Sequence, residues 1–331
     1  MNILHLPIEI AGQIGAICSS LQQRGYFARG FNFFSTYLGY KEHLLNTDVF
    51  EMGRMFEEAT QWFDLFHYHY GLSLYPKFKD LELLKQLGKP VVMHHWGNDV
   101  RMNSIARLHN PYVYTGDSPP EETVRRTLTT LGHYISDVIV QDYEVLPYVE
   151  PYYRRVHVIP LAIELNRFTP AYPSLAEKNP LVVHAPTNQA FKGTFHIEKA
   201  IEALRKEMPF RYNRIEKMSH EEAVRMYRQA DIVIDQILCG SYGLLSVEAM
   251  AFGKPVIAYI RPDLLPKYVG LPISIANPDT IYDVLKDLLL SPEKRLQAGL
   301  AGRSYVERQH ESGKVAEQIL KVYQLARTNT G

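Results

Sequence analysis

Short apolar runs rich in β-branched residues recur along the chain, and stretches with helical spacing separate them. In the first half these runs occupy residues 2–6, 28–34, 65–70, 90–95, 137–141 and 156–160. In the second half they occupy residues 181–184, 211–217, 231–237, 255–260 and 272–276, and helical patterns follow at 279–290, 293–309 and 314–327. Strands that alternate with helices are typical of parallel sheets, so the pattern predicts an α/β protein.

The most informative stretch is a strand, a glycine turn, a short helix and a second strand between residues 231 and 260. We expect the helix to begin after Gly243 and to end before Gly253. The N–H groups of Leu244 and Leu245 at its start suit a phosphate, and Glu248 lies one turn further on, where a carboxylate can accept two sugar hydroxyls. An ordinary βαβ turn without a ligand is the alternative interpretation.

Composition excludes several classes of protein. The chain has 331 residues, of which 46% are hydrophobic and 22% charged, as in a globular protein of two domains. Lys plus Arg and Asp plus Glu are both 36, so we expect no nucleic-acid binding. The two cysteines predict neither a disulfide framework nor a cysteine-based metal site, and a cytoplasmic protein is expected. No run is long enough to span a membrane, although peripheral contact at its inner face stays open.

The same stretch resembles the signature of retaining GT-B glycosyltransferases of family 4. Their pattern is Glu-Gly-Phe-Gly, four residues, and then Glu-Ala-Met-Ala-x-Gly-x-Pro-Val. This chain matches the pattern at Gly243, Glu248, Ala249, Met250, Ala251, Gly253, Pro255 and Val256. It departs from the family at Gly240, where the first glutamate belongs, and at Thr187, where an arginine is frequent. The resemblance implies two Rossmann-like domains that face each other across a cleft.

The resemblance also assigns roles to particular residues. Lys192 before Gly193 corresponds to the lysine that binds the donor diphosphate, and Glu248 to the residue that holds the ribose. Residues 215–217 would flank the nucleobase. The glycine turn after the first strand would lie over the donor sugar, and its glycine spacing does not fit a dinucleotide fingerprint. These donor-side residues are Gly12, Gln13, Lys192, Gly243, Leu244, Leu245 and Glu248, with Ile215, Glu216 and Lys217 at the base.

Histidines follow two of the predicted strands, at positions 67, 69, 94 and 95. His67 and His69 share one face of their strand, which is tolerable metal geometry, but no Cys or Glu motif accompanies them. We therefore expect hydrogen-bonded structural histidines and no metal. By resemblance, His95 lies beside the anomeric carbon of the donor as a hydrogen-bond donor, and Asp99 faces the acceptor.

The prediction is thus a hexosyltransferase that moves a sugar from a nucleotide-sugar, with UDP expected, to a glycan, lipid or small-molecule acceptor, with retention and without a metal or cofactor. The expected domains are residues 1–162, residues 163–313 and a C-terminal helix, 314–331, that packs back on the first domain. The loop at 102–123 is expected to be a lid, an acceptor-binding segment or a plain connection. A non-catalytic nucleotide-sugar-binding protein and a nucleotide-sugar epimerase or hydrolase are the alternatives.

Overall fold

The computed structural model describes residues 1–34 and 36–328 and contains two compact units. The first unit comprises Met1–Ile105, Ser118–Ala162 and the segment from Ser312, and the second comprises Ala106–Asp117 and Ile163–Glu311. The chain passes into the second unit after residue 162, where the sequence places its domain boundary. Residues 329–331 of the expected last segment lie outside the described residues.

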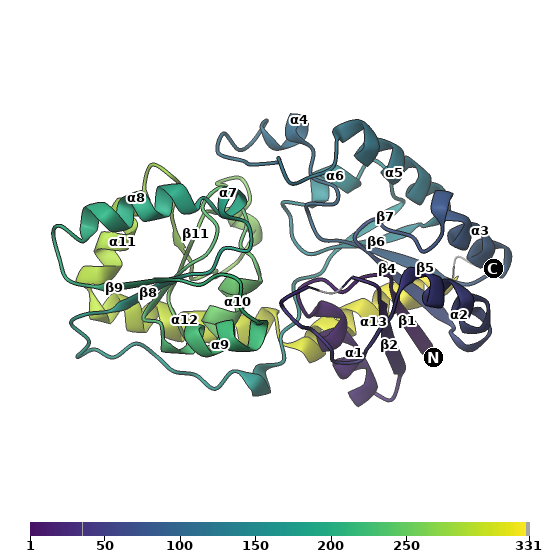
Figure 1. Cartoon of the computed structure of the whole chain (residues 1–331), viewed down its shortest axis with the longest axis horizontal. Helices are drawn as coiled ribbons and strands as arrows, with labels where there is room; N and C mark the ends of the chain where they lie inside the picture. Colours follow the sequence, from purple (N-terminus) through teal and green to yellow (C-terminus); the bar gives the residue numbers. More distant parts are fainter. Residues whose placement is uncertain (35, 329–331) are drawn as a thin grey trace. The chain divides into compact units, whose positions relative to one another are not determined.

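A parallel sheet of seven strands forms the centre of the first unit (Figure 1), in the order β3-β2-β1-β4-β5-β6-β7. Its strands are β1 (Asn2–Leu6), β2 (Phe27–Asn32), β3 (Leu44–Asn46), β4 (Leu65–His69), β5 (Val91–His95), β6 (Asp137–Val140) and β7 (Arg155–Val158). After β1 the chain builds β2 and β3 on one side and then returns to build β4 on the other side. The edge above β1 is therefore a topological switch point, where doubly wound folds bind ligands.

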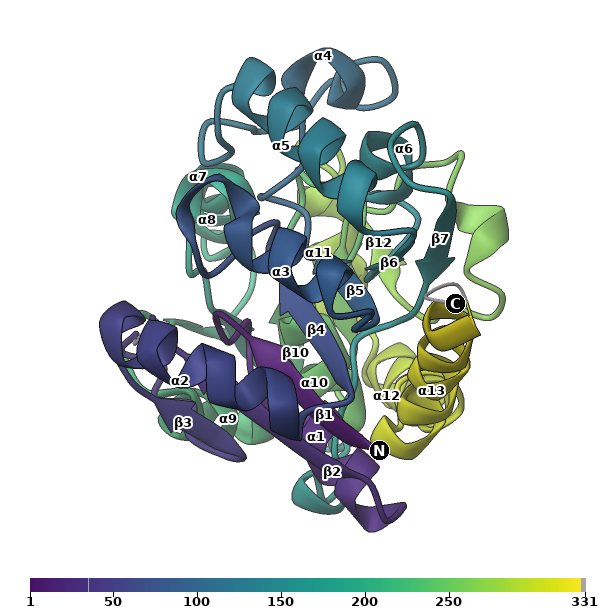
Figure 2. The same cartoon turned by 90° about the vertical axis from the view of Figure 1, so that its right-hand side faces the viewer.

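Helices cover both faces of this sheet. The helices in the segments of this unit are α1 (Gln13–Gln23), α2 (Val49–Trp62), α3 (Lys79–Gln86), α4 (Asn103–Ala106, whose last residue belongs to the second unit), α5 (Glu121–Tyr134), α6 (Leu146–Val149) and α13 (Ser312–Thr328), with a 3-10 turn at Pro76–Phe78. One face packs on α1 and α13, and Figure 2 shows α2 and α3 on the opposite side of the strands. The C-terminal helix contributes Val315, Ile319 and Tyr323 to the core of this unit.

The second unit is built on a parallel sheet of five strands in the order β12-β11-β10-β8-β9. Its strands are β8 (Leu181–His184), β9 (Arg211–Arg214), β10 (Ile232–Ile234), β11 (Val256–Ala258) and β12 (Ser274–Ile275). Its helices are α7 (Gln189–Lys192), α8 (Thr194–Leu204), α9 (His220–Gln229), α10 (Leu244–Ala251), α11 (Ile281–Leu290) and α12 (Pro292–Gln309), with 3-10 turns at Leu165–Arg167 and Leu265–Lys267. In Figure 1, α8 and α11 cover one face, and α9, α10 and α12 cover the other. Two parallel-sheet domains confirm the predicted fold class.

The loop expected at 102–123 has a different organisation from the one predicted. Residues 106–117 pack within the second unit although the chain on both sides belongs to the first. The buried side chain of Asn110 donates to the carbonyls of Leu238 (2.8 Å) and Cys239 (3.0 Å), directly before the Gly240 turn. The ring of Tyr112 packs edge-on against that of Tyr259. The first domain as predicted, 1–162, therefore lacks this segment.

Among the described residues, no helix combines the length and the apolarity that crossing a membrane requires.

Candidate functional site

The glycine turn of the second unit is held by a buried carboxylate that the sequence analysis missed. Asp235 follows β10, and its Oδ2 accepts the N–H of Gly243 (3.0 Å) and the hydroxyl of Ser246 (2.7 Å). Its Oδ1 accepts from Lys192 Nζ at 2.7 Å. Burial alone would raise the pKa of Asp235, but the ammonium of Lys192 and these hydrogen bonds lower it. Asp235 therefore joins the predicted cation to the predicted phosphate turn.

Lys192 reaches this turn from the end of α7. Its Nζ also donates to Gln236 Oε1 at 2.8 Å, and the amide of Gln236 donates to the carbonyl of Ser241 at 2.6 Å. The turn then leads into α10, whose first residues are Leu244 and Leu245. An α-helix does not use the N–H groups of its first turn internally. The ammonium group of Lys192 and the first backbone N–H groups of α10 are thus linked through the same turn.

Glu248 is 4% exposed and lies one turn into α10. Its Oε1 is 2.5 Å from Nε2 of His220, the first residue of α9. Burial opposes the charge on His220, but the hydrogen bond and the negative charge of Glu248 raise the pKa of His220 above its usual value. A capping box of Ser219 and Glu222 starts α9 and places His220 at its first residue. The sequence analysis did not predict the pairing of His220 with Glu248.

The three residues predicted at the nucleobase follow β9. The side chain of Ile215 is buried in the protein, and Glu216 pairs with Arg214 at 3.2 Å. Lys217 has a positive φ of 54°. Backbone groups and the polar ends of Glu216 and Lys217 are the parts of this segment that a base can reach, because the side chain of Ile215 packs inward.

In the first unit, His95 lies at the end of β5 in a fully buried hydrogen-bonded triad. Its Nδ1 is 2.6 Å from Asp99 Oδ2 and its Nε2 is 2.8 Å from the hydroxyl of Tyr153. The other oxygen of Asp99 accepts the N–H groups of Trp96 and Gly97 at 3.0 Å each. Burial and the charge of Asp99 raise the pKa of Tyr153 well above its usual value. The hydroxyl of Tyr153, a residue that no sequence motif indicated, thus occupies Nε2 of His95, the histidine that the resemblance places beside the donor sugar.

The turn after β1 is closed by the chain itself. The amide of Gln13 is buried and bonds both backbone groups of Ala162, as donor to its carbonyl (3.1 Å) and acceptor from its N–H (2.8 Å). Glu9 accepts the N–H groups of Ile14 (3.3 Å) and Gly15 (3.2 Å) at the start of α1. In this structure the side chain of Gln13 ties the turn to Ala162. The carboxylate of Glu9 already binds the first N–H groups of α1, which a phosphate would otherwise need.

Four buried histidines stack on one face of the first sheet. Nitrogens of His5, His67 and His69 lie within 4.8 Å of one another, so their type and spacing suit a metal. However, His5 Nδ1 and His69 Nε2 are 3.0 Å apart while their ring centroids are 5.3 Å apart. These distances describe two nitrogens that point at each other, which leaves no space for an ion between them.

Instead, a directed chain of hydrogen bonds links three of the four histidines. The indole of Trp96 can only donate, and it donates to His69 Nδ1 at 3.3 Å. His69 then donates to His5, and the hydroxyl of Tyr323 contacts both His5 Nε2 (3.4 Å) and His67 Nδ1 (2.7 Å). Burial lowers the pKa of His5 to about 3 and keeps the rings neutral. His94 instead stacks on Trp96, and among the described residues neither of its ring nitrogens has a hydrogen-bond partner. The prediction of a hydrogen-bonded histidine therefore holds for His67, through Nδ1, and is wrong for His94.

Comparisons with known proteins were made by sequence and by structure. No protein-family model matches the chain. The chain is 25% identical over 310 residues to the D-inositol 3-phosphate glycosyltransferase of Xylanimonas cellulosilytica, an alignment that covers 79% of this chain and 72% of the relative.

The structural comparisons show the GT-B fold. The sucrose-phosphate synthase of Thermosynechococcus elongatus superposes with a TM-score of 0.66 at 14% identity, covering 99% of this chain and 100% of the other. The S. aureus MnaA structure with UDP superposes with a TM-score of 0.55 at 14% identity, covering 98% of each chain.

The turn at Gly240 generates a first prediction. Gly240 has a φ of +90°, and a Cβ built there would lie 2.5 Å from Arg261 Cγ, whereas Gly25 has a φ of +80° with nothing within 4 Å of such a Cβ. Gly25→Ala should cost about 1 kcal/mol in unfolding free energy from backbone strain alone. Gly240→Ala should cost about 1–3 kcal/mol more because the Arg261 stem must move. Urea unfolding measures both, and equal losses would show that Arg261 moves freely.

The pairing of His220 with Glu248 generates a second prediction. Because the folded-state pKa of His220 is raised above 6.5, its contribution to stability is complete below that value and is lost as the pH rises through the folded-state pKa. His220→Asn should therefore lower the unfolding free energy by about 1–2 kcal/mol at acidic pH and by less at alkaline pH. His133→Asn, at an exposed position, is the control. A loss that does not change with pH would contradict a charged His220.

Proposed function

We propose that this chain, a member of the GT-B glycosyltransferases of group 1, transfers a sugar from a nucleotide-sugar donor to an acceptor. One observation carries the proposal: Asp235 joins Lys192 to the turn at the start of α10, and Glu248 lies one turn further along the same helix. The sequence similarity to a named glycosyltransferase over 79% of the chain supports it.

The diphosphate would bind at the start of α10. The leaving nucleoside diphosphate gains negative charge as the bond to the sugar breaks, and fixed donors aimed at that charge lower the barrier. Lys192 Nζ and the N–H groups of Leu244 and Leu245 are such donors. With these groups in place the reaction needs no metal, and activity is expected to persist in a chelator.

The ribose would bind at Glu248. The pairing with His220 uses Oε1, so Oε2 is the oxygen assigned to the ribose hydroxyls. His220 in its charged form offsets the cost of burying this carboxylate and fixes its rotamer. Glu248 would thus be ready for the ligand before the ligand arrives.

UDP as the nucleotide, retention of configuration and the role of His95 are the finer parts of the proposal, and they rest on the family resemblance. Asp99 orients the ring of His95, and the bond from Nε2 to Tyr153 would be exchanged for one to the sugar. His95 would then donate a hydrogen bond in the transition state.

The direct test is a turnover assay with UDP-, GDP-, ADP- and TDP-sugars and a broad panel of acceptors. Release of nucleoside diphosphate that depends on an acceptor would support the proposal. Release without any acceptor would instead indicate a hydrolase or an epimerase side reaction, and binding without turnover would indicate a non-catalytic protein.

Lys192→Ala should weaken the binding of nucleoside diphosphate by about 1.5–3 kcal/mol, or roughly ten- to a hundredfold, because a charge-assisted contact is lost. Binding of the nucleoside alone should be almost unchanged, and calorimetry measures both. Lys199→Ala, on α8, is the control. Equal losses for the two ligands would place Lys192 away from the diphosphate.

Glu248→Gln should weaken nucleoside and nucleoside diphosphate equally, by about 1–3 kcal/mol, since a neutral amide accepts less strongly from two ribose hydroxyls. Glu221→Gln, an exposed position on α9, should have no effect. Wild-type affinity in the Glu248 variant would refute the ribose assignment.

A further inference from the structure

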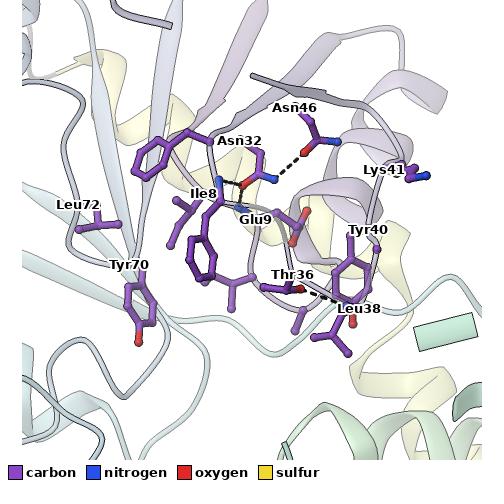
Figure 3. Close-up of a pocket in the computed structure, with 15 residues that line it drawn as sticks. Ile8, Glu9, Asn32, Thr36, Leu38, Tyr40, Lys41, Asn46, Tyr70 and Leu72 are labelled. Carbon is purple, nitrogen blue, oxygen red and sulfur yellow. Dashed lines mark hydrogen bonds between the residues drawn. The ribbon is translucent and has the colours of Figure 1, made fainter. Parts of the chain in front are cut away.

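The first unit contains a cavity of about 660 Å³ at the carboxyl ends of its first four strands (Figure 3). The segments that follow β1, β2 and β4 form its walls, together with the end of β3. It lies above β1, at the switch point of the sheet, and its volume is that of a site for a small molecule. All of its lining residues belong to the first unit, whereas the residues proposed to bind the nucleotide belong to the second.

The walls of the cavity are mainly apolar. The side chains that supply this surface are Ile8, Phe33, Phe34, Leu38, Tyr70 and Leu72. Among the lining residues that the structure describes, Lys41 is the one basic side chain, and it is exposed. A phosphate requires several donors or cations, so these walls do not suit an anion.

Two polar side chains in the walls of the cavity, those of Asn32 and Glu9, are already used by the protein. Asn32 Oδ1 accepts the N–H of Glu9 (3.0 Å) and of Phe34 (3.2 Å), and its amide donates to Asn46 Oδ1 (2.6 Å). The carboxylate of Glu9 accepts N–H groups of α1. These bonds shape the walls, and most of the surface that remains for a ligand is apolar.

Two residues in the walls have a strained backbone. Ala11 and Tyr70 have φ values of 53° and 65°, which non-glycine residues rarely adopt. Such conformations cost about 1–3 kcal/mol each and cluster at ligand sites. The same conformation occurs at four residues outside the lining, so the strain agrees with a ligand site here and the shape and chemistry of the walls carry the argument.

The cavity also adjoins the triad of His95. Gly71 follows Tyr70 directly, and a Cβ on Gly71 would lie 3.5 Å from Asp99 Oδ2 and 3.6 Å from His95 Cε1. The backbone of Gly71 therefore lies directly beside the Asp99–His95 pair, one residue after Tyr70 in the cavity wall.

We propose that this cavity binds the acceptor and that the part of the acceptor bound there is apolar and uncharged. The inference rests on the proposed function and names the acceptor class within it. The acceptor inferred here differs from D-inositol 3-phosphate, for which a relative of this chain is named, because that compound is a small polar anion and the cavity walls do not suit an anion.

The test uses a neutral fluorescent probe, N-phenyl-1-naphthylamine, with four proteins: the wild type, Leu72→Asp, Phe34→Asp and the control Leu87→Asp. Leu72 (36% exposed) and Phe34 (56%) line the cavity, and Leu87 (49%) lies at the end of α3 outside it, so all three substitutions fall on partly exposed positions. The wild type and the Leu87 variant should bind one probe molecule. The other two variants should bind it at least tenfold more weakly, with unchanged affinity for UDP.

Displacement identifies the ligand class. Octyl β-D-glucoside below its micellar concentration should displace the probe, whereas glucose and D-inositol 3-phosphate should not. In the turnover assay, the acceptors that work should carry an apolar group, and Leu72→Asp should raise their KM about tenfold without changing the KM of the donor.

Equal probe binding by all four proteins, or displacement by D-inositol 3-phosphate, would overturn the inference while leaving the proposed function intact. A wild type that binds the probe but no nucleotide would overturn the proposed function, and with it the acceptor assignment.

Discussion

The ligand turn of the second unit depends on the buried charge pair between Asp235 and Lys192. An isolated carboxylate at this depth would be costly, and the cost is offset only because Asp235 also bonds the backbone of Gly243 and the hydroxyl of Ser246. The side chain of Asp235, directly after β10, therefore fixes the position of Lys192 and of the start of α10. In the proposed function, a diphosphate would share Lys192 with Asp235.

A comparison with Glu9 shows why the two glycine turns differ although they look alike in the sequence. Both acids accept N–H groups at the start of a helix. Burial raises the pKa of Glu9 to about 7, whereas the pKa of Asp235 is lowered. The difference is Lys192, since no cation contacts Glu9 among the described residues. Of these two turns, only that of the second unit therefore combines helix donors with a positive charge, and the cavity beside Glu9 in the first unit is mainly apolar.

Much of the fold could be predicted because hydrophobic periodicity is a local property. β1 and β8 have the predicted bounds, and α12 begins one residue before its predicted start. β3 was missed, since three residues, Leu44–Asn46, are too few to show a period. The domain to which residues 106–117 belong could not be predicted either, because Asn110 bonds carbonyls that lie 128 and 129 residues away.

The site shows the same division between local and distant information. Lys192, Glu248 and His95 are visible in motifs, but the groups that set their properties are not. Lys192 pairs across 43 residues with Asp235, Glu248 across 28 with His220, and His95 across 58 with Tyr153. No spacing rule links such pairs, because tertiary packing alone brings them together.

Gly240 illustrates how a departure from a family pattern can be read only in three dimensions. In the sequence it is a missing glutamate. In the structure, the stem of Arg261 and the amide of Asn110 occupy the space around it, and a Cβ there would be 2.5 Å from the one and 3.2 Å from the other. Asn110 belongs to the segment that crosses into this unit, and Arg261 is tied to Asp263 at 2.6 Å. The glycine is thus required by the side chains that surround it, and the turn that it forms remains fully supported without the glutamate.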